Sequence, residues 1–174
     1  MKLQFALAIV PLPFAGWSEE RPLSALIESV TAGVFCPDDF MPSVPAPMTE
    51  RGTIYTPAAE PVITWQTREV PARHGLAFGI TLKQAEGPLL QGLEVKVTRP
   101  RETGGISVER WPAWIGDAGT TTNFWVFDDP DEIAEGNWRF EISRGPEKLA
   151  DVTFVVMNPS DIKGPVPDCV LTLS

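Results

Sequence analysis

Two tryptophans in a short stretch rich in glycine and proline are the residues best suited to recognise a ligand. Trp111 and Trp114 belong to the stretch 111–119, which directly follows Arg110. Aromatic rings held in a loop can form a platform for sugar rings, a peptide or a partner protein. The alternative is that both rings fold back and cover one end of the domain. The candidate ligand-binding residues are therefore Arg110, Trp111 and Trp114, and the expected ligand is a protein or a carbohydrate.

An acidic corner, residues 128–132, offers oxygen ligands of the kind that Ca²⁺ prefers. It lacks the glycine and the alternate-residue spacing of a calcium loop. A solvated corner before a helical turn at 131–135, whose acids stabilise the first amides of that turn, explains it equally well. The same acids could hydrolyse a glycosidic bond, but nothing in the sequence indicates the large cleft that such an enzyme builds. The sequence predicts neither a metal site nor a cofactor.

The residues required for nucleophilic catalysis are scarce. His74 is the single histidine of the chain, and it lies on the apolar side of a strand or at its start. That position favours a structural role over a catalytic one. A Gly-x-Ser-x-Gly elbow, a phosphate loop and a cluster of histidines are all missing from the sequence. We predict no catalytic residue, and we predict that the protein is not an enzyme.

Cysteine content and the first residues both point to export. Residues 1–18 combine a basic start, an apolar run and small residues before Glu19, which predicts a signal peptide. An uncleaved membrane anchor is the alternative, but the run is short and interrupted by prolines. In an oxidising compartment Cys36 and Cys169 would form a disulfide rather than remain two buried thiols. We expect one domain, residues 19–174, in the periplasm or secreted, with no membrane insertion after cleavage.

The elements that must position these residues are strands. From Gly136 to Met157 apolar and polar side chains alternate on both sides of a turn at 144–146, which predicts a hairpin with one dry face. A hairpin alone is unstable in water, so another sheet must cover that face. Further strands are expected at 24–36, where a helix is the rival, and at 53–56, 62–70, 74–83, 89–98, 106–110, 120–127 and 169–173.

Three finer expectations follow from these patterns. The strands 74–83 and 89–98 should form a second hairpin, and 120–127, apolar on both faces, should be central in its sheet. The segment 36–50 carries four prolines and should be a loop on the surface or along an edge. Seven to nine antiparallel strands with frequent turns are typical of an all-β sandwich.

The stretch 73–157 resembles a family of uncharacterised secreted bacterial domains with an immunoglobulin-like fold. The likeness is carried by residues 73–79, by the strand end 97–100, by the Gly-x-Trp-x-Phe hairpin at 135–142 and by the returning residues 154–156. It implies an immunoglobulin-like β-sandwich and export, but no activity. The cysteines lie near the two ends of the domain, unlike the inter-sheet pair of an antibody domain.

The formal net charge of −9 disfavours nucleic acid and anionic membranes as partners. The function most consistent with all these features is a non-enzymatic, exported binding or accessory module of the bacterial envelope. One alternative is a structural envelope subunit that adds a strand to a partner's sheet. The other is a hydrolase that uses Asp and Glu.

Overall fold

The computed structural model describes residues 24–37, 41–129, 132–165 and 169, and they form an almost entirely β-strand structure. The predicted signal peptide, residues 1–18, lies outside this part of the chain. No helix among the described residues is long and apolar enough to cross a membrane. The elements in chain order are β1 (Ile27–Phe35), β2 (Ser43–Pro45), β3 (Thr53–Tyr55), β4 (Glu69–Pro71), β5 (Ala77–Gln84), β6 (Leu93–Pro100), β7 (Ile106–Ala113), β8 (Thr120–Val126), β9 (Gly136–Arg144), β10 (Glu147–Met157) and the 3-10 helix η2 (Pro159–Asp161).

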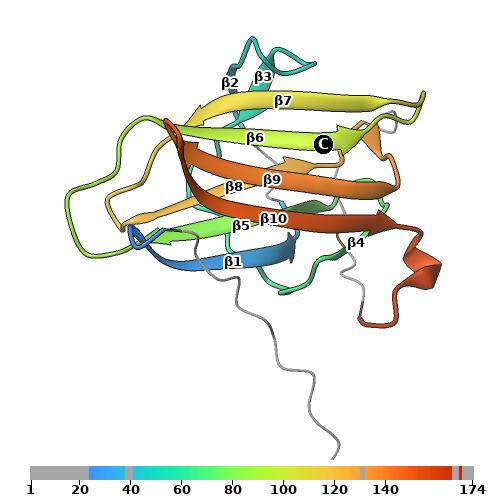
Figure 1. The fold of residues 1–174 in the computed structure, drawn as a ribbon. Coiled ribbons are helices and arrows are strands. Elements are labelled where there is room, and N and C mark those ends of the chain that lie inside the picture. The colour runs from blue at the N-terminus through green and yellow to red at the C-terminus, as the bar shows by residue number, and fades with distance from the viewer. Residues whose placement is uncertain (1–23, 38–40, 130–131, 166–168, 170–174) are drawn as a thin grey trace, which may run out of the picture.

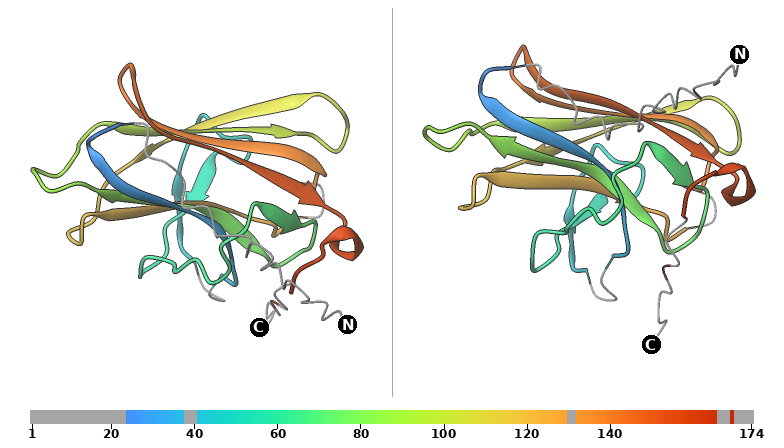
Figure 2. Two further views of the ribbon diagram at one scale, coloured as in Figure 1. Left: turned by 60° about the horizontal axis from the view of Figure 1, so that its bottom comes forward. Right: turned by 90° about the horizontal axis from the view of Figure 1, so that it is seen from below.

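Two sheets face each other in a sandwich (Figures 1 and 2). One sheet has the strand order β4-β10-β9-β6-β7 and the other β1-β5-β8, while β2 and β3 form a separate two-stranded sheet. The predicted all-β sandwich is confirmed, and its ladders are antiparallel except for the short β4, which pairs with β10 in parallel. Strands of both sheets bury one face against the other, which is how a sandwich forms its core.

Aromatic rings from both sheets fill the centre of the sandwich. Phe78 of β5 contacts Trp138 and Phe140 of β9 and Phe154 of β10, with ring centroids 5.2–5.7 Å apart. The planes are steeply inclined, as aromatic pairs prefer. All four side chains are fully buried. The dry face predicted for the hairpin is therefore covered by the three-stranded sheet.

The hairpin predicted between Gly136 and Met157 is β9–β10, and its register is antiparallel throughout. Gly145 in the turn adopts φ +55°, a conformation that glycine reaches without strain. One residue of the wet face departs from expectation, because the Glu141 side chain is only 10% exposed. It is covered by Lys96 and Lys148, whose ammonium groups lie 2.5 and 2.6 Å from its carboxylate.

The second predicted hairpin does not exist. β5 pairs with β1 and β8, whereas β6 pairs with β7 and β9, so the two strands lie in opposite sheets. The segment between them crosses from one layer to the other. Alternation correctly predicts each strand, but it does not identify the strand's partner, because the strands of both layers alternate in the same way.

The outer face of the three-stranded sheet is also covered, in contrast to the usual wet face. Tyr55 and Ile63 of the segment 55–65 pack against buried residues of this face, and Trp65 forms an isolated bridge with Val34 at the free edge of β1. A Cβ atom on Gly33 would lie 2.1 Å from the Trp65 carbonyl oxygen, and one on Gly79 would lie 2.1 Å from that of Asn123. Both positions therefore require glycine, because a side chain would collide with the neighbouring backbone.

Several predicted boundaries are wrong. The segment 62–70 is no continuous strand: it contributes the single bridge at Trp65 and then the start of β4. β8 lies at the edge of its sheet instead of the centre, and its two apolar faces reflect the covering segment 55–65. The helical alternative for 24–36 is excluded, because β1 occupies most of that range. Within the proline-rich segment, Ser43–Pro45 forms the short β2.

The predicted disulfide is present. Cys36 and Cys169 are bonded; their Cα atoms are 5.2 Å apart, and the two residues are 133 positions apart in the sequence. The bond joins the end of β1 to the C-terminal segment. Closing a loop of this length stabilises a fold by up to about 4–5 kcal/mol in the chain-entropy description. Except for Cys169, the predicted last strand lies outside the described residues.

Candidate functional site

The edges of the two sheets approach each other on one side of the sandwich. β7 ends the five-stranded sheet and β8 ends the three-stranded sheet. The indole Nε1 of Trp111 on β7 donates a hydrogen bond of 3.3 Å to Asn123 Oδ1 on β8. We call the line between these edges the β7–β8 seam. One half of it is closed by the β2–β3 unit (residues 43–55) and the other half is open.

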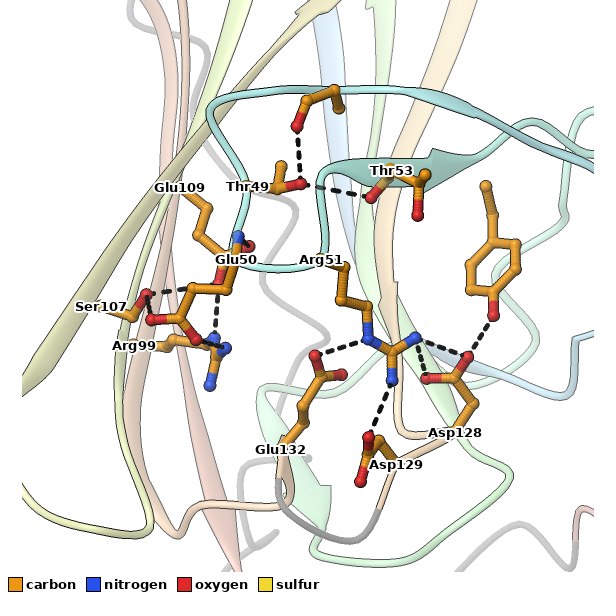
Figure 3. A network of polar contacts seen from close by, with 12 residues as sticks. Thr49, Glu50, Arg51, Thr53, Arg99, Ser107, Glu109, Asp128, Asp129 and Glu132 are labelled. Atoms are coloured by element: carbon orange, nitrogen blue, oxygen red, sulfur yellow. Dashed lines mark hydrogen bonds and ion pairs between the residues drawn. The ribbon is translucent and has the colours of Figure 1, made fainter.

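Two adjacent residues of opposite charge at the tip of the β2–β3 unit form the ion pairs that close this half of the seam. Figure 3 shows Glu50 and Arg51 pointing in different directions from the turn. The Glu50 carboxylate accepts hydrogen bonds of 2.7 Å each from Arg99 Nη2, Arg101 Nε and Ser107 Oγ. Burial alone would raise the pKa of Glu50, but the bonds from Ser107 and Arg101 outweigh it and hold the pKa below its ordinary value.

Arg99 belongs to a second, fully buried ion pair beneath Glu50. Its Nε lies 2.9 Å from Glu109 Oε1, and both side chains are 2% exposed. The guanidinium also lies 4.8 Å from the ring centre of Trp125 and 5.3 Å from that of Trp138. A buried charge without a partner is costly, so this pair binds the closed half tightly to the core.

Arg51 enters an acidic site on the other side of the turn (Figure 3). Its guanidinium lies 2.7 Å from both Asp128 Oδ1 and Glu132 Oε1 and 3.8 Å from Asp129 Oδ2, and the Tyr55 hydroxyl donates to Asp128. Burial would raise the pKa of Asp128, but the bonds from Arg51 and Tyr55 bring it below its ordinary value. At Glu132 burial prevails over Arg51, and the pKa is raised.

The acidic corner is thus the docking site of an arginine. Asp131 lies outside the described residues, and among those described no group of three His, Cys, Asp or Glu side chains is placed to hold a metal ion. His74, the predicted structural histidine, hydrogen-bonds through Nε2 to the Asp128 carbonyl oxygen at 3.0 Å. The ion pairs with Arg51 thus connect the acidic corner to the β2–β3 unit, and the hydrogen bond with His74 connects it to the segment before β5.

The open half of the seam is a groove of about 240 Å³. Trp111 lies at its base with 5% of its surface exposed, and Trp114 stands at its rim with 56% exposed. Its three walls are the end of β7 with the loop that follows it, the edge of β8, and the end of β3 with the loop that follows it. The lining residues are Ile54, Tyr55, Thr56, Pro57, Glu60, Pro61, Trp111, Pro112, Ala113, Trp114, Gly116, Thr120, Thr121, Thr122, Asn123 and Phe124.

A carboxylate and two hydroxyls form the polar part of the groove. Glu60 accepts hydrogen bonds from Thr120 Oγ1 at 2.5 Å and from Thr122 Oγ1 at 2.9 Å. No cation of the described residues pairs with Glu60. The remaining walls are mainly aromatic and proline surface, so the groove combines apolar contact area with one negative charge, which is the composition of many recognition sites.

The structure brings together two of the three predicted ligand-binding residues. Trp111 and Trp114 both line the groove, whereas Arg110 points to the opposite face of its sheet and lies 3.4 Å from Glu94. Trp111 is not in a loop: β7 extends to Ala113 and includes Pro112. Neighbouring residues of a strand face opposite sides, so Arg110 and Trp111 cannot share a site.

Sequence reasoning missed the wall opposite the tryptophans. Glu60 and Tyr55 precede Trp114 by more than fifty positions, and no local pattern places them beside it. The run of three threonines at 120–122 was the one local sign of this wall, because it places several hydroxyls at the start of a strand.

The fold and the seam define an immunoglobulin-like β-sandwich with a groove at one sheet edge. A crystal structure of an immunoglobulin-like protein from Pseudomonas aeruginosa is similar, with a TM-score of 0.53 and 23% sequence identity over 77% of this chain and 100% of that chain. Residues 23–156 match the family described as a domain of unknown function, DUF3859, and the chain belongs to this family. No curated protein matches it.

Proposed function

We propose that the protein is an exported, non-enzymatic binding module whose ligand occupies the open half of the seam. The observation that carries this proposal is the exposure of Trp114, 56%, at the rim of a groove with a second tryptophan at its base. A large exposed aromatic beside a preformed concavity is typical of a ligand anchor.

Export is supported by the disulfide between Cys36 and Cys169, because such bonds persist in oxidising compartments. The features of residues 1–18 that predict a signal peptide agree with it. We infer a periplasmic or secreted protein of the envelope. Its net charge of −9 favours a neutral or cationic partner over nucleic acid.

A hydrolytic role finds less support. Asp128, Asp129 and Glu132 share the guanidinium of Arg51, and that site is occupied by the β2–β3 unit. The carboxylate of the open groove, Glu60, lies beside threonine hydroxyls without a second acid. Glycoside hydrolysis needs a pair of carboxyl groups flanking the scissile bond.

Site-specific photo-crosslinking tests the proposal. Benzoylphenylalanine replaces Trp114 in the full, disulfide-bonded chain, which is then illuminated in an envelope extract of the source organism. A discrete covalent adduct is expected at this position. The matched control carries the probe at Val108, which is 50% exposed on the outer face of β7, the strand that ends just before Trp114. Equal labelling at both positions, or no adduct at position 114, would contradict a binding role for the groove.

A further inference from the structure

The groove runs along the edge of β8 and not across a face. Five consecutive residues of that strand, 120–124, line it. Side chains alternate between the two faces of a strand, so a groove on one face would be lined by every second residue. A groove that meets every residue in turn must follow the strand's edge, where backbone groups as well as side chains are presented.

The hydrogen bonds at both ends of the β5–β8 ladder show which residues face that edge. The amide of Gln84 donates to the carbonyl of Gly119, and the amide of Phe127 donates to that of Leu76, both at 2.9 Å. The register of the ladder is regular between these points. In an antiparallel pair the residues bonded to the neighbour alternate with residues directed away from it. Odd-numbered residues of β8 therefore bond to β5, and even-numbered residues point to the free edge.

Among the even-numbered residues of β8 that line the groove, Thr122 and Phe124 have backbone groups that are still able to pair. The carbonyl of Thr120 already accepts the amide of Gly116 at 2.8 Å. No described residue hydrogen-bonds to the backbone amide or carbonyl of Thr122 or Phe124. An exposed row of such groups on a strand edge is a template for another strand.

The facing edge of β7 cannot serve in the same way. The outward amide of Arg110 donates to the Met48 carbonyl at 3.1 Å, and the next outward residue is Pro112, which has no amide hydrogen. Proline on an edge strand is one of the ways in which proteins block unwanted pairing. The seam therefore offers backbone pairing on the β8 side and side-chain surface on the β7 side.

We propose that the occupant of the groove is an extended segment of a partner polypeptide that adds as a strand to the free edge of β8. This proposal rests on the proposed function and specifies the chemistry of its ligand. Backbone groups of the segment pair with those of Thr122 and Phe124. A side chain of the segment packs against Trp114, and a lysine or arginine lies at Glu60, the unpaired negative charge of the groove. Main-chain bonds supply affinity in this mode of recognition, and alternate side chains supply specificity.

The test uses a random heptapeptide library displayed on phage and selected on the full, disulfide-bonded protein. The best peptide is then synthesised with a single N-methyl group at each backbone position in turn. Strand addition predicts a period of two: methylation at alternate positions weakens binding at least tenfold, and methylation between them changes it less than threefold. The selected peptides should be enriched in Lys and Arg, and Glu60→Gln should weaken binding several-fold.

A matched pair of variants locates the peptide on β8. Thr122→Pro removes the outward amide hydrogen but no bond to β5, and should weaken binding at least tenfold. Thr122→Val removes the hydroxyl and keeps the amide, and should change binding less than threefold. Near-ultraviolet circular dichroism checks that both variants fold, and the N-methyl scan on the unaltered protein decides the matter if the proline variant does not.

Several outcomes would overturn the strand-addition proposal while leaving the proposed function intact. These are a library that yields no binder, peptide binding without alternation in the N-methyl scan, or binding of soluble oligosaccharides that Trp114→Ala abolishes. In each case an adduct at position 114 would still show that the groove is occupied. Absence of that adduct contradicts the proposed function itself.

Discussion

The two halves of the β7–β8 seam are built on the same two strands and differ in what lies between them. In the closed half, Glu50 and Arg51 bring opposite charges from a distant segment and satisfy a buried arginine and an acidic corner. In the open half, Glu60 also comes from a distant segment but bonds only to threonine hydroxyls of β8, and among the described residues an aromatic groove with an unpaired strand edge remains. The comparison teaches that the same two strand edges can be completed by charged side chains from a distant segment, and that this happens along only half of the seam.

The closed half should be far more sensitive to substitution than the open half. Glu109→Ala removes the buried partner of Arg99 and leaves only Glu50, which is 37% exposed, and we expect a loss of about 3–5 kcal/mol in the free energy of unfolding. Urea denaturation followed by tryptophan fluorescence measures it. The double variant Arg99→Met with Glu109→Met should recover most of the loss, since it leaves no unpaired charge. A loss below about 1 kcal/mol for Glu109→Ala would show that the pair is not buried as described.

The base of the groove should behave like the closed half. Trp111→Ala removes a ring that is 95% covered, and we expect a loss of about 3 kcal/mol, the low end for a large aromatic because the space opens into the groove. Trp111→Phe retains a ring and loses the bond to Asn123, so its loss should be about 1 kcal/mol. Urea midpoints of the two variants give the comparison. Equal losses would mean that the hydrogen bond, not the packing, fixes the ring.

Arg51 tests how firmly the β2–β3 unit is attached. Arg51→Met leaves Asp128 and Glu132 without their cation, and we expect a loss of about 1–3 kcal/mol. The control is Lys83→Met, which removes an exposed ion pair with Glu28, for which we expect less than about 0.5 kcal/mol. Thermal unfolding in low and high salt measures both. Similar losses for the two variants would contradict a distinct role for Arg51.

Acid should loosen the closed half, with one group acting in the opposite sense. The pKa values of Glu50 and Asp128 are lowered in the fold, so their stabilisation is present above the ordinary carboxyl range, near pH 4, and is lost as the pH falls below it. The pKa of Glu132 is raised by burial, so its contribution is present at low pH and is lost as the pH rises.

The two opposing effects can be separated by substitution. Glu132→Gln removes the carboxyl group whose protonation stabilises the fold in acid. The free energy of unfolding, measured by urea denaturation, should therefore decline more steeply from pH 6 to pH 3 in this variant than in the unaltered protein. We expect the difference between the two profiles to be on the order of 1 kcal/mol across this range. A shallower decline in the variant would show that Arg51, and not burial, dominates the titration of Glu132.

How far these features could be predicted depends on how local they are. The β9–β10 hairpin was predicted from alternation alone, because its two strands adjoin in sequence and its turn contains Gly145. The sheet partners of β5 were not, since β1 and β8 lie far along the chain on either side. The cysteine pair was an exception among distant contacts, because covalent chemistry and compartment leave few partners for a thiol.

In the candidate site, too, local features could be predicted and contacts between distant segments could not. Trp114 and Trp111 were recognised as a pair, but Pro112 made their segment resemble a loop. Pro112 instead occupies an outward position of an edge strand, which is one of the few places in a sheet that accept proline. The contacts of Glu50 with Arg99 and of Arg51 with Asp128 join residues 49 and 77 positions apart, and no local pattern indicates them.

The smallest effect on stability is expected at the rim of the groove. Trp114→Ala removes a ring that is 56% exposed, and the free energy of unfolding should change by less than about 0.5 kcal/mol. The same substitution should reduce binding of a groove-selected peptide at least tenfold, whereas Arg110→Ala, on the opposite face, should leave binding within threefold. A recognition residue can be lost without cost to the fold, because its contacts are made with the ligand. If Trp114→Ala instead destabilises the protein as strongly as Trp111→Ala, both rings belong to the core, and the open half of the seam is closed by packing after all.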